Sequence, residues 1–103
     1  MIRVSYETGN HCMTMDGHAG AGEYGHDIVC AAASILMHTL EATVMDNQTV
    51  LQPSVSKRKG YARIQCEPTK RNKRRCEDIY RTIFRGYELL AQQYPEHVTA
   101  YTI

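Results

Sequence analysis

Hydrophobic and polar residues alternate near the start of the chain. Residues 2–6 are apolar at every second position, which predicts a first β-strand. Gly9-Asn10 is typical of a tight turn, so we expect residues 12–15 to return as an antiparallel second strand. The many glycines of residues 17–25 then indicate a loop rather than a helix or strand.

A long apolar segment follows this loop. Ala, Leu, Ile and Met dominate residues 28–45, which predicts a largely buried helix. Asp27 is a suitable N-cap for this helix. We expect Asp46 and Asn47 to end it.

Two strands are predicted next. Residues 51–55 alternate, and Pro53 favours an edge position because proline cannot donate a ladder hydrogen bond. Residues 57–60 are expected to turn the chain into a fourth strand, residues 61–66. Pro68 ends that strand.

A second helix is predicted over residues 72–93, and Pro95 lies beyond its end. Its expected apolar stripe consists of Cys76, Ile79, Ile83, Tyr87 and Leu90. Residues 98–103 alternate as a last strand. The order ββαββαβ predicts an α/β single-domain sandwich spanning residues 1–103, with one mixed sheet and two helices.

The composition places few limits on function. A net charge of +1 creates no strong field toward nucleic acid or membranes. Residues 1–7 are too short and polar for a signal peptide, and no apolar run is seen that approaches the ~18 residues of a membrane span. We therefore expect a cytoplasmic protein with no membrane contact, whose cysteines are reduced.

Cys30 is the candidate nucleophile. With Asp27 as N-cap, Cys30 falls in the first turn of the helix, where unpaired N–H groups and the helix dipole favour a thiolate. The same N–H groups are suited to hold the oxyanion of a tetrahedral intermediate. A buried, inert side chain is the alternative for a cysteine in an Ala-rich helix.

His18 is the candidate general base. It stands at the end of the second strand, and the glycine loop returns the chain to the helix start, so His18 and Cys30 can meet in space. His26 is nearer in sequence, but the direction of its side chain is not fixed by its position. Asp27 is either a helix cap alone or a third group that orients His18. Ser34 shares the helix face of Cys30 and either bonds locally or lines the site.

Two other kinds of site are considered. A zinc site is chemically possible, but the ligand spacings match no compact zinc motif, so no metal is expected. The residues involved are His11, Cys12, His18, His26 and Cys30. The basic run at residues 70–75 either contacts phosphate, with weak support for base stacking from Tyr61 and Tyr80, or is a solvated helix start. Cys66 and Cys76 are expected to be packing residues.

The residues around Cys30 form a longer pattern. The chain reads GHAG at residues 17–20, YGHDIVCAA at residues 24–32, and then has Ser34. This pattern resembles the signature of the ribosomal-processing cysteine protease family, Prp: Gly-His-Ala, a glycine-bearing loop, Asp-Ile-Val-Cys-Ala, and a serine one turn on. The motif covers about 18 residues, and the ββαββαβ order is similar to that of the family along nearly the whole chain.

The resemblance implies roles for these residues. His18 and Cys30 match the catalytic pair of the family. Gly17, Asp27 and Ser34 match its supporting positions. The loop is implied to be a gate near the substrate, formed here by Gly20, Gly22, Tyr24 and Gly25.

The resemblance also implies a biological role. Members of the family are small cytoplasmic homodimers without a cofactor that remove the N-terminal extension of a large-subunit ribosomal protein, cutting after a phenylalanine. Related enzymes of phages or prophages cut scaffold or capsid precursors. The alternative that belongs to a different class of protein is a non-enzymatic module that binds the ribosome or RNA through residues 70–75.

Overall fold

The computed structural model describes residues 1–17 and 26–103, which include a five-stranded mixed sheet in the order β3-β4-β2-β1-β5. β1 (Ile2–Glu7) pairs antiparallel with β2 (Cys12–Gly17), and β2 pairs antiparallel with β4 (Tyr61–Cys66). β3 (Pro53–Arg58) lies outside β4, and β5 (Val98–Thr102) runs parallel to β1 at the opposite edge. The mixed sheet is therefore confirmed, and so is the edge position expected from Pro53.

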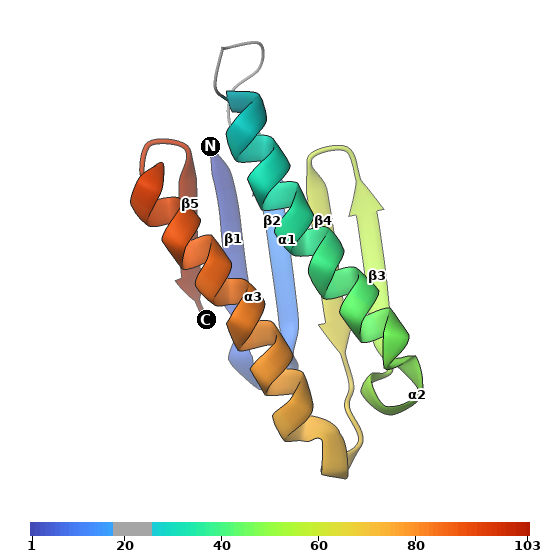
Figure 1. Cartoon of the computed structure of the whole chain (residues 1–103). Helices are drawn as coiled ribbons and strands as arrows, with labels where there is room; N and C mark the ends of the chain where they lie inside the picture. Colours follow the sequence, from blue (N-terminus) through green and yellow to red (C-terminus); the bar gives the residue numbers. More distant parts are fainter. Residues whose placement is uncertain (18–25) are drawn as a thin grey trace.

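Two long helices cover one face of this sheet (Figure 1). α1 (His26–Asp46) crosses the centre of the sheet, and α3 (Lys73–Gln93) lies beside it toward β5. A short helix, α2 (Gln48–Leu51), and a 3-10 turn at Lys70–Asn72 make the connections below them. A second 3-10 turn, Thr8–Asn10, joins β1 to β2 where a tight turn was predicted.

The core lies between the sheet and the two helices. From α1 it receives Val29, Ala33, Met37, Leu40 and Val44, which are spaced by three or four residues and are almost fully buried. From β1 it receives the alternate residues of the strand, as expected for a sheet with one covered face. The other face is formed by polar residues such as Arg3 and Thr99, which are opposite each other on β1 and β5.

α3 differs in detail from the predicted stripe. Tyr80 and Phe84 are buried in the core, whereas Ile79 is only partly buried. Tyr80 is fully buried, so its ring is not available for base stacking, and its hydroxyl donates a hydrogen bond to the carbonyl of Ile64 at 3.0 Å. The suggested role of Tyr80 in nucleic-acid binding is therefore wrong.

Three boundaries also differ. Leu51 belongs to α2 and not to a strand, because its fully buried side chain closes the end of the core before β3 begins. Lys57 continues β3, whose ladder with β4 extends to Arg58, so the turn is shorter than predicted. α1 begins at His26, which makes Asp27 its second residue and not its cap.

The apolar character of α1 exceeds what was expected. Residues 28–46 are long and apolar enough, by length and composition, to cross a membrane, so the statement that no such run exists is wrong. In the fold one face of this helix packs on the sheet, and 28% of the segment is buried. Its outer face is therefore unusually apolar for a surface helix.

Candidate active site

Cys30 lies in a pocket between α1 and the hairpin of β3 and β4. The pocket has a volume of about 270 Å³. Gly17, at the end of β2, and Ser34, one helical turn after Cys30, also line it. The structure thus brings together three of the residues that the sequence singled out, from two separate elements.

Gly17 holds the strand end at the pocket in a way that requires glycine. Its φ of +103° is a conformation that residues with a side chain rarely adopt. A Cβ atom at this position would overlap the carbonyl oxygen of Met1. The Gly17 N–H donates a hydrogen bond to the Gly60 carbonyl at 2.9 Å, which ties the end of β2 to the β3–β4 turn.

Cys30 is the fifth residue of α1, so it begins the second turn and not the first turn as expected. Side chains of an α-helix tilt toward its N-terminus, and the sulfur therefore points back along the helix toward the first turn. The unpaired N–H groups of a helix belong to that first turn. Cys30 is half-buried, which leaves its thiol accessible from the pocket.

Sequence reasoning missed His38, which lines the same pocket. Cys30, Ser34 and His38 are four residues apart from one to the next, so they follow one face of α1. His38 is exposed and lies ~12 Å along the helix axis from Cys30, too far to take the thiol proton directly. The sequence could have indicated His38, because it follows Ser34 by four residues and therefore lies on the same face of the helix.

The rim of the pocket carries positive charge that the sequence pattern did not reveal. Lys57 and Arg58 line the pocket from β3. The Lys57 ammonium forms an ion pair with Glu41 of α1 at 2.9 Å, and the Arg58 guanidinium stacks 4.0 Å above the ring of Tyr61. The floor is apolar and consists of Ile2, Met15, Ala33, Met37 and Ala62.

α3 fixes α1 beside this pocket. The Tyr87 hydroxyl donates a hydrogen bond to the carbonyl of Ala33 at 2.6 Å, and it lies 3.6 Å from the sulfur of Met15. Ala33 and Met15 both line the pocket. Burial raises the pKa of Tyr87 well above its usual value, so the hydroxyl stays a donor at neutral pH.

Comparison with known proteins supplies the missing context for this geometry. The family described as "Cysteine protease Prp" matches residues 1–99 of the chain. This chain belongs to the Prp family of cysteine proteases. It is therefore a peptidase, and the family resemblance and the enzyme class expected from the motif are confirmed.

Individual proteins that are similar to this chain agree with this assignment. The ribosomal processing cysteine protease Prp of Staphylococcus aureus (strain Mu50 / ATCC 700699) is 31% identical over 85 residues, which cover 82% of this chain and 78% of the relative. A crystal structure of Prp from S. aureus in complex with a covalently linked product peptide has a TM-score of 0.80 and 28% identity, with full coverage of both chains. SMU.848 from Streptococcus mutans has a TM-score of 0.72 and 27% identity over 99% of this chain and 91% of its own.

Several residues of the Prp motif are not placed. His18 and the gate residues Gly20, Gly22, Tyr24 and Gly25 lie outside the described residues. The backbones of His26 and Asp27 belong to α1, but their side chains lie outside the description. The catalytic role of His18, the gate and the orienting role of Asp27 therefore stay predictions.

The remaining cysteines lie away from the pocket. Cys12, Cys66 and Cys76 are free, buried thiols, whereas Cys30 is the more exposed one. A hydrogen bond from Cys76 lowers the pKa of Cys66, but Cys66 is only 2% exposed. Among the side chains that the structure describes, those of residues 1–17 and 28–103, no three His, Cys, Asp or Glu groups are arranged to hold a metal ion.

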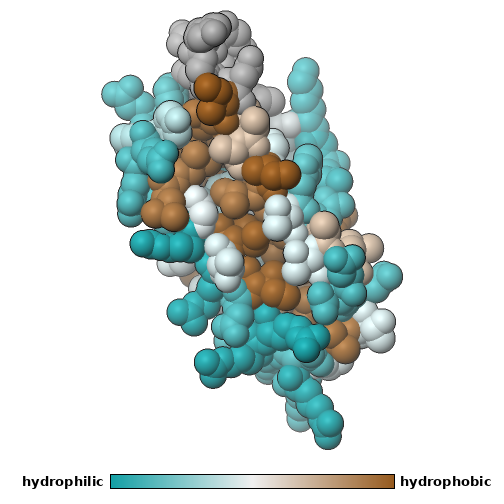
Figure 2. Space-filling model, viewed as in Figure 1, coloured by the Kyte–Doolittle hydropathy of each residue, from teal (hydrophilic) through white to brown (hydrophobic). Residues whose placement is uncertain are grey.

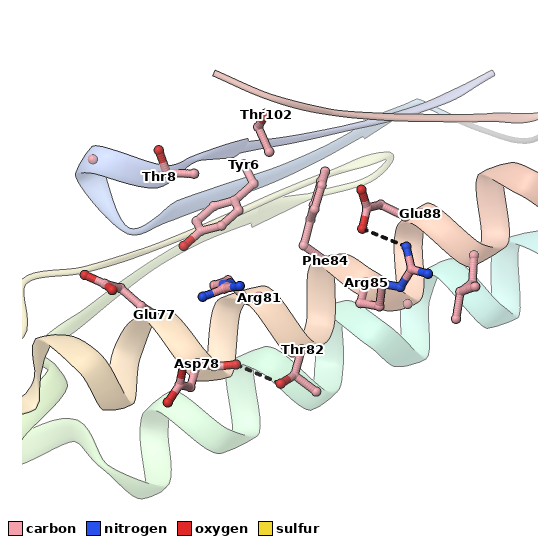
Figure 3. Close-up of a pocket in the computed structure, with 13 residues that line it drawn as sticks. Tyr6, Thr8, Glu77, Asp78, Arg81, Thr82, Phe84, Arg85, Glu88 and Thr102 are labelled. Atoms are coloured by element: carbon pink, nitrogen blue, oxygen red, sulfur yellow. Dashed lines mark hydrogen bonds and ion pairs between the residues drawn. The ribbon is translucent and has the colours of Figure 1, made fainter.

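A larger pocket, of about 1130 Å³, lies on the other side of α3 (Figure 3). Tyr6 and Phe84 contribute its aromatic surface, and the ion pair of Arg85 with Glu88 borders it. None of the motif residues that the structure describes lines this pocket. Because it holds no nucleophilic thiol, we assign the active site to the smaller pocket around Cys30.

Proposed function

We propose that this Prp-family peptidase removes the N-terminal extension of a large-subunit ribosomal protein, with Cys30 as nucleophile and His18 as general base. The observation that carries the proposal is the convergence of Gly17, Cys30 and Ser34 on one pocket, which apolar residues and the basic residues Lys57 and Arg58 also line. The 31% identity to a ribosomal processing protease supports the substrate class.

His18 is proposed as the base because of its place in the chain. It directly follows Gly17, and Gly17 lines the pocket that contains Cys30. His18 accepts the proton of the Cys30 thiol, and the sulfur then attacks the scissile carbonyl carbon. N–H groups of the first turn of α1 stabilise the resulting oxyanion.

The second half of the reaction returns the enzyme to its starting state. The proton held by His18 passes to the leaving amine as the peptide C–N bond breaks, which leaves an acyl-enzyme on Cys30. Water then attacks the thioester while His18 takes its proton, and the carboxylate product leaves with the thiol restored. No step of this sequence requires a cofactor.

The pocket supports cleavage after an aromatic residue. Its apolar floor, which includes Met15, Met37 and Ala62, lies beside Cys30 and is suited to a large apolar side chain. We infer that the phenylalanine expected before the scissile bond occupies this floor. Lys57 and Arg58 at the rim are then placed to contact polar groups of the peptide.

A cleavage assay tests the proposal. A peptide that copies the N-terminal extension is incubated with the wild type, with Cys30→Ala and with Cys76→Ala. We expect cleavage by the wild type after phenylalanine, a loss of turnover of ~10⁴-fold or more in Cys30→Ala, and retained activity in Cys76→Ala, whose thiol is buried in the core. Retained cleavage by Cys30→Ala would exclude the assigned nucleophile.

Two further measurements separate the parts of the proposal. His18→Ala is expected to lose most of its activity, and a near-normal rate would transfer the role of base to His26. Wild-type cleavage of a phage scaffold or capsid precursor, with none of the ribosomal peptide, would assign the chain to the phage-type alternative. In either case alkylation mapped by mass spectrometry should find Cys30 modified before Cys66, because Cys66 is buried.

We also propose that the enzyme acts as a cytoplasmic homodimer, as the family resemblance implies. An enzyme that matures a ribosomal protein must meet it where ribosomes are assembled. The peptidase assignment leaves no need for the non-enzymatic module as an alternative. The exposed basic run at residues 70–75 lies at the opposite end of the helix layer from the start of α1 (Figure 1), so it is expected to be solvated surface.

A further inference from the structure

The larger pocket beside α3 is separate from the Cys30 pocket. Its volume is about 1130 Å³, and none of the residues that the structure describes lines both pockets. It lies where α3 passes the ends of β1 and β5, since Tyr6 and Thr102, which are register partners in these strands, both line it. Figure 3 shows the strand ends on one side of the pocket and α3 on the other. The proposed cleavage leaves this pocket unused.

The Tyr6 hydroxyl is a polar group of this pocket without a hydrogen-bond partner. Tyr6 is only 3% exposed, and its ring stacks on that of Tyr80 with the ring centroids 5.6 Å apart. In the part of the chain that the structure describes, no group forms a hydrogen bond with its hydroxyl. Polar groups buried to this degree are nearly always hydrogen-bonded in native proteins. The Tyr6 hydroxyl is therefore left to water or to a ligand that enters the pocket.

Arg81 of α3 is a second donor in the same part of the pocket. Figure 3 shows Arg81 below the ring of Tyr6, whose side chain points from β1 toward α3. Burial raises the pKa of Tyr6, so its hydroxyl keeps its proton at neutral pH, and the positive charge of Arg81 opposes this shift. No carboxylate among the described residues forms an ion pair with Arg81. A guanidinium and a protonated hydroxyl thus lie close together without an acceptor.

The acidic residues that line the pocket already have basic partners. At distances of 3.4, 3.9 and 3.9 Å respectively, Glu88 lies next to Arg85, Asp78 next to Arg74, and Glu77 next to His11. A cationic ligand would have to compete with these partners, whereas an anionic ligand would meet a cation, Arg81, that has none. The pocket therefore favours one negative charge beside Arg81.

An apolar surface lies within one helical turn of Arg81. Phe84 follows Arg81 by three residues, and its ring centroid lies 5.7 Å from that of Tyr6. Leu89, which is 44% exposed, continues the apolar wall along α3. Figure 2 shows hydrophobic side chains along the middle of the face that the helices form, and hydrophilic side chains over the N-terminal half of α3. The apolar wall of the pocket is thus set among polar groups, as in many ligand sites.

We propose that this pocket binds the C-terminal end of a peptide whose last side chain is large and apolar. The carboxylate accepts hydrogen bonds from the Arg81 guanidinium and the Tyr6 hydroxyl, and the last side chain packs against Phe84. The volume exceeds the range of about 300–1,000 Å³ that is usual for small ligands, so further residues of the peptide have room. A peptidase creates a new carboxylate end at each cleavage, so its own reaction supplies ligands of this class.

A phosphate group is the other anion that an arginine commonly binds, and the pocket suits it less. A phosphate monoester carries close to two negative charges at neutral pH. Here it would meet one arginine without a partner and the carboxylates of Glu77, Asp78 and Glu88. A carboxylate carries a single charge, which Arg81 alone balances. The apolar wall also has no counterpart in a bare phosphate.

Titration of the full wild-type chain with the peptide acetyl-Ala-Ala-Phe, followed by NMR of the backbone amides, tests the proposal. We expect shifts at Thr8, Thr82 and Thr102, which line the pocket. The same peptide with a C-terminal carboxamide should bind ~10-fold or more weakly there, because it lacks the charge that pairs with Arg81. Acetyl-phenylalanine alone distinguishes two sources of this chemistry: tighter binding of the tripeptide assigns a peptide end, and equal affinity assigns a small apolar acid. Shifts absent from this pocket, or equal affinity of acid and carboxamide, would overturn the proposal.

Two variants test the donors separately. Arg81→Gln should weaken binding by ~10-fold or more, whereas Arg3→Gln, which removes the same charge from the uncovered face of the sheet, should leave it unchanged. Tyr6→Phe should weaken binding but not lower the free energy of unfolding, because no hydrogen bond of the free protein is lost. Far-UV circular dichroism confirms that each variant is folded. Unchanged affinity in Arg81→Gln, or a loss of stability in Tyr6→Phe as large as that in Tyr87→Phe, would contradict the assigned site.

Discussion

α1 and α3 are helices of equal length on the same face of one sheet, yet their sequences are organised differently. α3 is amphipathic: Tyr80 and Tyr87 are buried, and charged residues such as Arg74 and Asp78 face solvent. α1 is apolar on both faces, with Leu40 fully buried and Ile35 largely exposed. The fold alone explains the pattern of α3, whereas it leaves large apolar residues of α1 exposed.

The same difference is seen in the cysteines and the tyrosine hydroxyls of the two helices. Each helix carries one cysteine, and Cys76 of α3 is fully buried whereas Cys30 of α1 opens into a pocket. The hydroxyl groups of Tyr80 and Tyr87 on α3 are turned toward the core. They donate hydrogen bonds to a backbone carbonyl of the sheet and to one of α1, respectively. α3 thus holds the framework in place, and α1 carries the cysteine whose thiol opens into a pocket.

Shortening a side chain to alanine should change the stability of the protein very differently on the two faces of α1. Leu40→Ala is expected to lower the free energy of unfolding by about 2–5 kcal/mol, because it leaves a cavity between helix and sheet. Ile35→Ala, at a position 60% exposed, should change it by less than about 0.5 kcal/mol in dilute solution. Urea unfolding of both variants at low protein concentration gives the comparison. Equal losses would mean that the outer face is not free in the monomer.

Alternation and helical periodicity predicted most of the fold because one face of most of its long elements is buried. β4 has the bounds that were predicted for it, and the structure contains all five of the predicted strands. α2 was missed because its single turn places the buried Leu51 where an alternating strand would also place an apolar residue. Phe84 was missed because the buried stripe of α3 is wider than the one chosen from the sequence.

The part of the site that lies on one helix was predictable from helical spacing. Cys30 and Ser34 share a pocket, as their helical spacing implied. Lys57 and Arg58 reach the same pocket through the pairing of β3 with β4, a long-range contact that no local period reveals. His38 follows the spacing of Ser34 and was within reach of the sequence.

Removing the hydrogen bond between α3 and α1 should lower the free energy of unfolding by less than removing a buried side chain such as that of Leu40. Tyr87→Phe leaves the ring in place but takes the donor from the Ala33 carbonyl, so we expect a loss of about 1–2 kcal/mol in the free energy of unfolding. Tyr101→Phe, on an exposed strand position, is the matched control and should be neutral. A similar loss in both variants would show that the buried hydrogen bond makes no net contribution.

Tyr87 should also contribute to the alkaline limit of stability. Its folded-state pKa is raised by burial, so the folded protein holds this proton more tightly than the unfolded chain does. The contribution is complete below the ordinary tyrosine pKa of about 10 and is lost as the pH rises above it. Tyr87→Phe should therefore flatten, without removing, the fall in stability above that pH, since the pKa of Tyr80 is raised in the same way by burial.

Close packing of Gly86 of α3 against Leu36 of α1 predicts a coupling between these two residues. A Cβ on Gly86 would lie 2.7 Å from Cδ2 of Leu36, so the leucine must move in Gly86→Ala. That crowding opposes the gain of ~1 kcal/mol that alanine brings to a helix interior, and the net change should be small. In a Leu36→Ala background the crowding is absent, and Gly86→Ala should then stabilise by about 1 kcal/mol. A double-mutant cycle in urea measures this coupling, and its absence would contradict the close packing of the helices.

The smallest effect is expected from the surface ion pairs of the two helices. Glu41 of α1 pairs with Lys57 of β3 at 2.9 Å, whereas Glu88 pairs with Arg85 within α3 at 3.4 Å. Because all four side chains are partly exposed, Glu41→Gln and Glu88→Gln should each cost less than about 1 kcal/mol, and the cost should fall with added salt. Only Glu41→Gln should also alter the KM of peptide cleavage, since it frees the Lys57 ammonium at the rim of the Cys30 pocket. An equal change in KM for Glu88→Gln would show that the rim charge is not what the peptide contacts.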